Sequence, residues 1–168
     1  AQGITPCPNG QLATNLILAA ENMADHLTHF YLFFMPDFAR DCYRDRPWFA
    51  SSLDRFKAQA GSANREVLPA RASFLHLTGI LAGKWPHSLA IQPGGSTRAL
   101  EVQERIRLLS TIKNFRHFLQ QTLFGDQLER VAELRSEQQL LDWAEQHPQS
   151  DFGFFLDMAE DLDLSAMG

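Results

Sequence analysis

The stretch that most constrains the fold is the run from Asn15 to Phe38, NLILAAENMADHLTHFYLFFMPDF. In and just before it, apolar side chains recur at steps of three and four residues, which is the spacing of one face of an α-helix. The members of this row are Leu12, Leu16, Ala19, Met23, Leu27, Phe30 and Phe34. We therefore predict a long helix near residues 10 to 35 whose apolar row faces the core.

A second row on the same stretch is polar, although it lacks the lysines and glutamates that a solvated helix face usually carries. Its members are Asn15, Asn22, His26, His29 and Phe33. We expect this face to contact something other than bulk water. His26 and His29 are three positions apart, a spacing at which two imidazoles can bind one metal ion. Because no third ligand follows at metal-site spacing, we interpret them as paired core or interface histidines and predict no metal site.

The rest of the chain also reads as mainly helical. A second long helix is expected from Thr97 to about Gly125, where an apolar row again has helical spacing. That row is Val102, Ile106, Leu109, Ile112, Phe115, Leu119 and Leu123. Asn9 is expected to cap the first long helix. Shorter helices are expected from Pro47 to Gly61, from Asn64 to Ala82, and after capping residues at Asp126, Ser136 and Ser150.

Between two of these helices lies the segment Gly83 to Ser96, GKWPHSLAIQPGGS, whose two prolines and three glycines break the helical pattern. We predict a long shaped loop there, with room for a short strand around Ser88 to Ile91. The predicted fold class is all-α: one helical domain over residues 1–168, a bundle of two long helices, several short ones and this loop.

Composition narrows the classes of partner. A net charge of −5 and the lack of a dense Lys/Arg run argue against nucleic acid. The most apolar window, Leu27 to Phe38, is too short to span a bilayer, so we expect no transmembrane segment and a cytoplasmic protein. Cys7 and Cys42 have no second thiol nearby in the sequence, and we interpret both as free.

Familiar catalytic patterns are missing from the sequence. There is no Gly-x-Ser-x-Gly elbow, and the Glu-x-x-His pair of a carboxylate-bridged diiron bundle does not occur. The run Pro93-Gly94-Gly95-Ser96 could receive an anion, yet it lacks the Gly-Lys-Ser/Thr ending of a phosphate loop. We favour the interpretation that its glycines permit a close backbone approach ahead of a helix.

Two strings resemble a known family. NLILAAENMADHLTHFYLFFMPDF (Asn15 to Phe38) and GKWPHSLAIQPGGSTR (Gly83 to Arg98) are similar to the central part of the large subunit of nickel-iron hydrogenases. The similarity is strongest to the hydrogen-sensing (regulatory) and cyanobacterial-type uptake groups. It continues through FRHFLQQTLFGDQLE (Phe115 to Glu129) and the final AEDLDLSAMG.

The resemblance implies a segment of an oxidoreductase that splits dihydrogen into protons and electrons, or senses it, at a nickel-iron centre. Its implied partners are the iron-sulfur small subunit and the remaining parts of the large subunit. In the family, four cysteines in two Cys-x-x-Cys pairs hold the centre, and this chain has neither pair. Cys7 and Cys42 match no ligand position. We therefore expect the chain alone to hold no cofactor, to contain no catalytic residue and to be inactive.

For individual residues, the resemblance implies supporting roles. The family's Gly-Lys-x-Pro-His element lies close to the small-subunit interface, which makes Lys84, His87, Gly94 and Gly95 candidates for that interface or for the surroundings of the metal centre. His26 and His29, in the matching HLTHFY motif, would pack the helix against the catalytic region. The alternative is a non-catalytic relative, a scaffold or maturation protein that keeps the helical core without the ligand cysteines.

One further expectation concerns self-association. In a segment cut from a larger subunit, apolar residues such as Trp85 and the Phe33-Phe34 pair would lose their usual covering. Burying apolar area is favourable by roughly 25 cal/mol per Å². We therefore expect that the isolated chain can form a homodimer through these residues.

Overall fold

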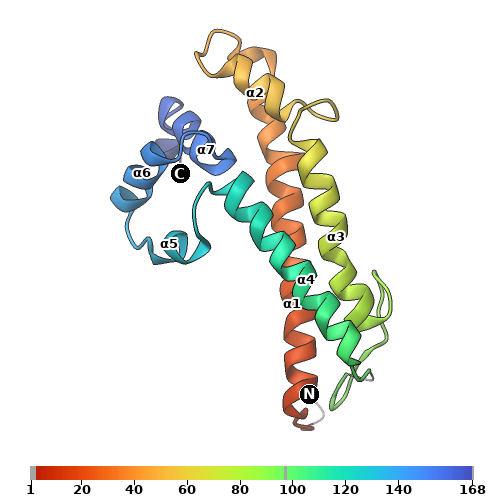
Figure 1. The fold of residues 1–168 in the computed structure, drawn as a ribbon. Coiled ribbons are helices and arrows are strands. Elements are labelled where there is room, and N and C mark those ends of the chain that lie inside the picture. Colours follow the sequence, from red (N-terminus) through yellow and green to blue (C-terminus); the bar gives the residue numbers. More distant parts are fainter. Residues whose placement is uncertain (1–2, 97, 168) are drawn as a thin grey trace. The chain divides into compact units, whose positions relative to one another are not determined.

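The computed structural model describes residues 3–96 and 98–167, and within them the chain is mainly helical (Figure 1). It divides into two compact units, Ala1–Lys113 and Asn114–Gly168, which are treated separately below. The described residues contain seven α-helices and a single two-stranded hairpin. The all-α prediction is confirmed. No helix in this part of the chain is both long enough and apolar enough to cross a membrane.

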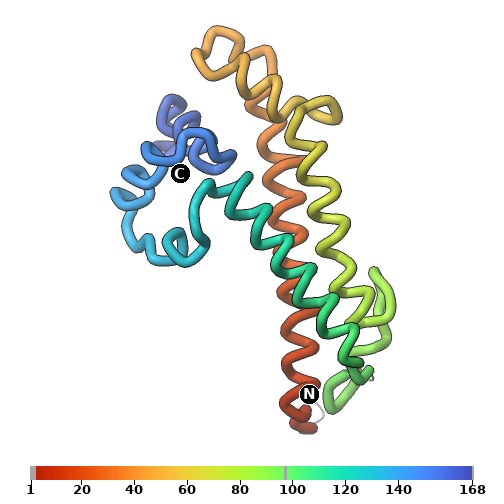
Figure 2. Tube along the Cα trace, viewed as in Figure 1, coloured from red at the N-terminus to blue at the C-terminus, as the bar shows by residue number. Residues whose placement is uncertain are grey.

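The first unit contains three long helices. The sequence pattern had predicted only two long helices in the chain. The elements in order are α1 (Pro8–Thr28), a π-helical turn (His29–Phe34), two 3₁₀ turns (Met35–Ala39 and Asp41–Tyr43), α2 (Phe49–Phe56), α3 (Asn64–Ala82), β1 (Ile91–Gln92), β2 (Gly95–Ser96) and the start of α4 (Val102–Phe118). The tube in Figure 2 shows α3 running back alongside α1 in the opposite direction.

The α1–α3 pair forms the core of this unit. Along α1 and the two turns that follow it a buried row recurs every three or four residues, and its small members Ala20 and Ala24 on α1 favour a close approach of the second helix. The row comprises Ile17, Ala20, Ala24, Leu27, Tyr31, Met35 and Phe38. On α3 the buried side chains are Val67, Phe74, Leu77, Thr78, Leu81 and Ala82. At the edge of the pair, Arg71 Nε donates a hydrogen bond of 2.5 Å to Thr28 Oγ1 and joins the two helices.

The apolar row predicted to face the core on α1 was largely the wrong one. Leu27 belongs to both rows, but Leu12, Leu16, Ala19 and Met23 are exposed. The physical reason is that α1 is apolar on more than one face, and helical spacing alone does not say which face a neighbour covers. The row carrying the small residues Ala20 and Ala24 packs against α3.

Some predicted ends of helices are correct and others are wrong. The helix Asn64–Ala82 has the predicted bounds, and it ends where Gly83 adopts φ 78, a left-handed conformation that glycine takes without strain. The helix expected from Pro47 to Gly61 is shorter and covers Phe49–Phe56. Asn9 is not a cap, because α1 already begins at Pro8. The predicted cap Thr97 lies outside the described residues.

The second unit contains the end of α4 and a series of shorter helices. These are a π-helical turn (Leu119–Leu123), α5 (Leu128–Glu133), α6 (Glu137–Gln146), α7 (Asp151–Asp161) and a final 3₁₀ turn (Leu164–Met167). Two predicted caps are confirmed: Ser136 Oγ accepts from the Gln139 amide, and Ser150 Oγ accepts from the Gly153 amide. The Asp126 cap is wrong, since α5 begins at Leu128 without a side-chain cap.

Asp126 instead belongs to a polar cluster inside the second unit. Its side chain is 9% exposed, and its Oδ2 lies 3.6 Å from His147 Nε2. His147 Nδ1 is 2.8 Å from the Trp143 carbonyl oxygen, and the Asp126 Oδ1 accepts from the Gln127 amide at 2.7 Å. The cluster thereby connects the segment before α5 to the C-terminal end of α6.

Several groups act on the ionisation of Asp126. Burial opposes the charged form, but the Gln127 amide, the Trp143 indole and the charges of Arg130 and His147 outweigh it, so the pKa of Asp126 is below its ordinary value. The buried Trp143 Nε1 lies close enough to the Asp126 carboxylate to favour its ionised form. The geometry between the two groups is not that of a good hydrogen bond. The folded second unit therefore favours the ionised carboxylate.

The assignment of the buried face of α1 can be tested by replacing leucine with alanine at two positions of the helix. Leu27→Ala empties a site that is 4% exposed, and we expect a loss of about 2–5 kcal/mol in unfolding free energy. Leu12→Ala makes the same change on the same helix at a site 60% exposed, where we expect a loss of about 0.5 kcal/mol or less. Urea unfolding followed by circular dichroism measures both. Equal losses would show that the buried row is misassigned.

The Asp126 cluster predicts a pH dependence of stability. Because its pKa is lowered on folding, ionised Asp126 stabilises the fold fully above its unfolded-state pKa, about 3.9, and the contribution is lost as pH falls through the lower folded value. The difference in unfolding free energy between the wild type and Asp126→Asn should shrink as the pH falls below about 4. Asp157→Asn, an exposed change on α7, serves as the control. A difference that grows on acidification would contradict the assignment.

Candidate functional site

The loop between α3 and α4 folds into a tight hairpin. β1 and β2 are antiparallel, with Gln92 paired to Gly95, so Pro93 and Gly94 form the turn. Proline at the first central position and Gly94 with φ 94 at the second are the features of a type II turn. Proline fixes φ at the first central position of the turn, and glycine tolerates the positive φ at the second. The predicted short strand is present at Ile91–Gln92, at the end of the expected stretch.

Gly95 brings this hairpin into backbone contact with the first turn of α1. A β-carbon added to Gly95 would lie 3.0 Å from the Gly10 Cα, and one added to Gly10 would lie 3.0 Å from the Gly95 Cα. Gly95 also has φ 132, which side-chain-bearing residues rarely adopt. The interpretation that a glycine here permits a close backbone approach is confirmed for Gly95, with the start of α1 as the element approached, whereas Gly94 forms the turn.

A pocket of about 680 Å³ opens beside this contact, and we call it the N-terminal pocket. Its lining comes from the start of α1, the end of α3, β2 and the chain that enters α4. The lining residues are Cys7, Asn9, Gly10, Leu12, Ala13, Leu16, Leu81, Ser96, Arg98, Ala99, Leu100 and Arg105. The walls are mostly apolar, with two guanidinium groups, and the volume lies in the range of ligand-binding pockets.

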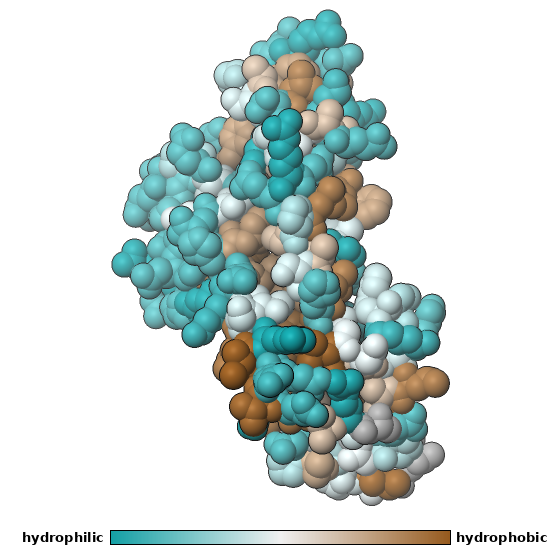
Figure 3. Space-filling view, turned by 45° about the vertical axis from the view of Figure 1, so that its right-hand side comes forward, coloured by the Kyte–Doolittle hydropathy of each residue, from teal (hydrophilic) through white to brown (hydrophobic). Residues whose placement is uncertain are grey.

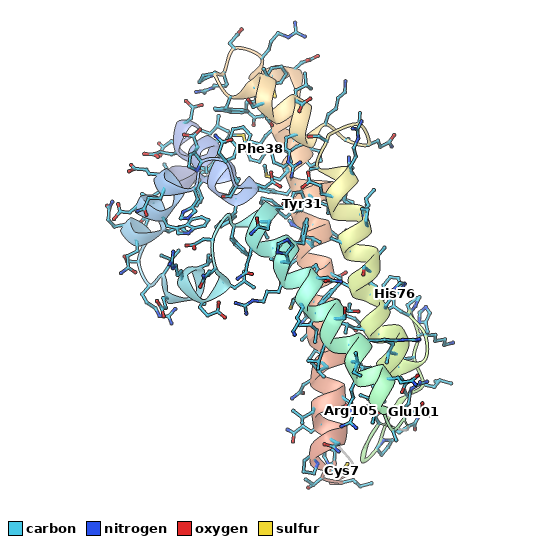
Figure 4. The ribbon with its side chains drawn as sticks, in the orientation of Figure 1. Cys7, Tyr31, Phe38, His76, Glu101 and Arg105 are labelled. Atoms are coloured by element: carbon cyan, nitrogen blue, oxygen red, sulfur yellow. The ribbon has the colours of Figure 1, made fainter. Side chains whose placement is uncertain are left out.

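The two arginines of this pocket differ in their pairing. Arg98 forms an ion pair with Glu104, which also accepts a hydrogen bond from the Glu101 amide at 3.0 Å. That backbone hydrogen bond outweighs partial burial and, with Arg98, lowers the pKa of Glu104. Arg105 forms no ion pair with any residue that the structure describes. Figure 4 shows Arg105 near the start of α4, at the same end of the unit as Cys7.

The chemistry of the N-terminal pocket is that of binding. None of its lining residues is a histidine, aspartate or glutamate, so the Cys7 thiol has no general base beside it in the lining. The apolar walls can bury a hydrophobic group, and Arg105 can pair with an anion. We therefore treat the pocket as a recognition surface.

The residues singled out on the loop lie near the N-terminal pocket but mostly outside it. Lys84, His87 and Gly94 are exposed, and Gly95 is half-buried against α1. Lys84 lines a smaller pocket of about 370 Å³ together with Arg98. The loop therefore presents Lys84 and His87 to solvent in this chain, where another protein surface could reach them.

His26 and His29 lie elsewhere in the first unit. Gly10, which contacts the hairpin, is sixteen positions before His26 on the same helix, which is about 24 Å along its axis. Both histidines are exposed, and the His29 ring stacks on Phe34 with centroids 6.2 Å apart. The structure thus separates the predicted site residues into a loop group and an α1 group.

Metal-binding side chains do not gather in the described part of the chain. No group of three His, Cys, Asp or Glu residues there is arranged to hold a metal ion. Cys7 and Cys42 are free and exposed. Cys7 precedes α1 and Cys42 follows it, so the helix, about 30 Å long, separates them. These two thiols cannot ligate one metal ion together in this fold.

Comparisons with known proteins were made on the whole chain. No protein-family model matches it, and a search of curated proteins finds no match. A function can therefore be proposed for this chain only from its residues and their arrangement.

Sequence reasoning missed the N-terminal pocket and its unpaired cation. The apolar row predicted for α4 does not include Arg105. In the structure Val102, Ile106 and Leu109 are exposed. A signal was available in the sequence, since Arg105 and Lys113 lie on the same side of the helix as the apolar row, and a helix side that carries arginine and lysine is rarely buried.

The hairpin contact yields a prediction with a matched control. Gly95→Ala should lower the unfolding free energy by about 1–3 kcal/mol, because the new methyl group meets Gly10 and the backbone angle is unfavourable for alanine. Gly79→Ala, in the last turn of α3 with open space around it, should instead raise stability by about 0.4–1 kcal/mol. Thermal unfolding of both variants measures the difference. Stabilisation by Gly95→Ala would rule out the tight contact.

Proposed function

We propose that this chain is the central segment of the large subunit of a nickel-iron hydrogenase of the hydrogen-sensing or uptake type, a cytoplasmic enzyme that oxidises or senses dihydrogen. In this role the segment supplies structure around a nickel-iron centre whose ligands lie in other parts of the subunit. Its loop contributes to the interface with the iron-sulfur small subunit.

The contact between α1 and the hairpin is the observation that carries this proposal. The two strings that resemble the family are far apart in the sequence, one on α1 and the π-helical turn that follows it and the other on the loop after α3. β2 packs against α1, and Gly95 touches Gly10. Gly10 lies on α1 five positions before the first string begins at Asn15, so the contact joins the second string to the helix that carries the first, and this shared helix supports the proposal.

The residues present do not fit a nickel-iron centre within this chain. Such a centre needs several thiolates converging on one point. Here the two cysteines flank a long helix, and both are exposed. No step of hydrogen chemistry can therefore be assigned to residues of this segment, and its contribution is limited to binding and positioning.

Lys84 and His87 are suited to an interface role. Both side chains are exposed on a loop whose hairpin is anchored to α1 at Gly95. An anchored loop loses little conformational freedom when a partner binds, which favours association. Lys84 offers a cation and His87 an imidazole N–H, so either group can donate a hydrogen bond to an acidic partner surface.

The proposal is tested by capture of a hydrogenase small subunit. We expect the purified chain to bind an iron-sulfur small subunit of the hydrogen-sensing type, and Lys84→Glu to weaken binding about tenfold, which corresponds to ~1.4 kcal/mol. Lys57→Glu, an identical charge change at another exposed position, should leave binding unchanged. Surface plasmon resonance measures the affinities. Equal effects of the two variants would exclude a specific role of the loop.

The alternative is a non-catalytic scaffold or maturation protein with the same helical core. The missing metal site is compatible with both functions. The nucleotide sequence on either side of the region that encodes this chain, read in the same frame, distinguishes the two functions. Cys-x-x-Cys pairs encoded in frame on both sides would support the hydrogenase subunit, and in-frame start and stop codons directly at the two ends would support the scaffold.

A further inference from the structure

One face of α4 is apolar and basic at the same time. At 3.6 residues per turn, six residues share roughly 120° of the helix surface, and this group contains no acidic side chain. They are Val102, Arg105, Ile106, Ile112, Leu109 and Lys113. All six are exposed, including Ile106 at 62% and Leu109 at 58%. Arg105 and Lys113 form no ion pair within the described residues.

The exposed row of α1 has the same character. Leu12, Leu16, Ala19 and Met23 are exposed, and the neighbouring polar positions on that face are Asn15, Asn22 and His26. Glu21 and Asp25 lie on other faces of the helix by the same spacing. This row therefore adds apolar area without adding negative charge.

The two faces meet at the N-terminal pocket. Leu12 and Leu16 of α1 line it together with Arg105 of α4 and with Leu100 before that helix. We call the combined surface of the α4 face, the α1 row and the pocket the basic apolar groove. In Figure 3 apolar side chains reach the surface in the lower part of the view, beside a band of hydrophilic ones.

Four kinds of occupant can cover such a surface, and the geometry distinguishes them. A small amphiphile could fill the pocket of about 680 Å³ but would leave Ile106 and Leu109 exposed. A flat bilayer would leave the hollow unfilled. A second copy docked symmetrically would place the same cations against each other, because a two-fold interface repeats one surface. A polypeptide with apolar side chains and carboxylates can fill the pocket, cover Ile106 and Leu109, and pair with the exposed cations.

We propose that the basic apolar groove binds an amphipathic acidic helix of another polypeptide segment, with its leucine-like side chains in the pocket and its carboxylates on Arg105 and Lys113. This inference rests on exposure and charge in the first unit and does not require the hydrogenase assignment. Helix-in-groove recognition of this kind depends on apolar anchors at helical spacing, and the flanking charges select the partner.

The test uses a designed probe. A fluorescein-labelled peptide of about three leucine–glutamate heptads is titrated with the full chain, and fluorescence anisotropy reports binding. The same peptide with lysine in place of glutamate is the charge control. We expect the acidic peptide to bind about tenfold or more tightly than the basic one, with an affinity that falls as salt is raised.

Matched variants locate the site on the chain. The double change Arg105→Glu and Lys113→Glu should reverse the preference between the two peptides, whereas Arg107→Glu, on another side of the same helix, should not. Leu12→Gln should weaken binding, and Leu18→Gln, which alters a similarly exposed leucine on another face of α1, should have little effect. Circular dichroism of each variant checks that helix content is kept.

Several results would overturn the proposal. It fails if neither peptide binds, if both bind equally, or if Arg107→Glu acts as strongly as the double change. It also fails if laurate displaces the acidic peptide, which would indicate a small-amphiphile site. Binding of phosphatidylserine vesicles without binding of the acidic peptide, or a dimer that the double change dissociates, would assign the groove to a membrane or to a second copy. None of these results bears on capture of the small subunit through Lys84.

Discussion

The packing of α1 against α3 is the constraint on which the rest of the first unit depends. Ala20 and Ala24 allow the two helices to approach closely, and larger buried side chains such as Leu27, Phe74 and Leu81 fill the space on either side. Once this face of α1 is covered, its other apolar row must point away from α3. The same packing brings the end of α3 near the start of α1, so the loop that follows can place Gly95 on Gly10.

Local interactions were the part of the fold that sequence could predict. The end of α3 at Gly83 follows from a glycine in a left-handed conformation, and the caps at Ser136 and Ser150 follow from one hydroxyl and the amide three residues later. Each depends on residues within a few positions of one another. The choice of the buried face of α1 depends on α3, more than forty positions further along the chain, and periodicity contains no information about that partner.

The same distinction applies to the candidate site. A close backbone approach at Gly94-Gly95 was predictable, because consecutive glycines after a proline have few other uses. The element approached was not predictable, since Gly10 is remote in sequence. Arg105 was missed for a related reason: the prediction for α4 depended on its apolar row, and which side of that helix a neighbour covers depends on residues remote in sequence. The separation of Cys7 and Cys42 follows from the helix between them and required no tertiary information.

Net charge is a poor guide to the partner of the first unit, because its charges are not evenly distributed. The sequence from residue 136 onward contains aspartates and glutamates but no lysine or arginine, and this region lies in the second unit. The overall charge of −5 therefore hides a groove on the first unit whose exposed charged side chains, Arg98, Arg105 and Lys113, are all cationic. At physiological salt, electrostatic attraction between exposed charges extends only about 8 Å. A partner that binds in this groove responds most strongly to the cations within that range, and so a chain of net negative charge can select an acidic segment.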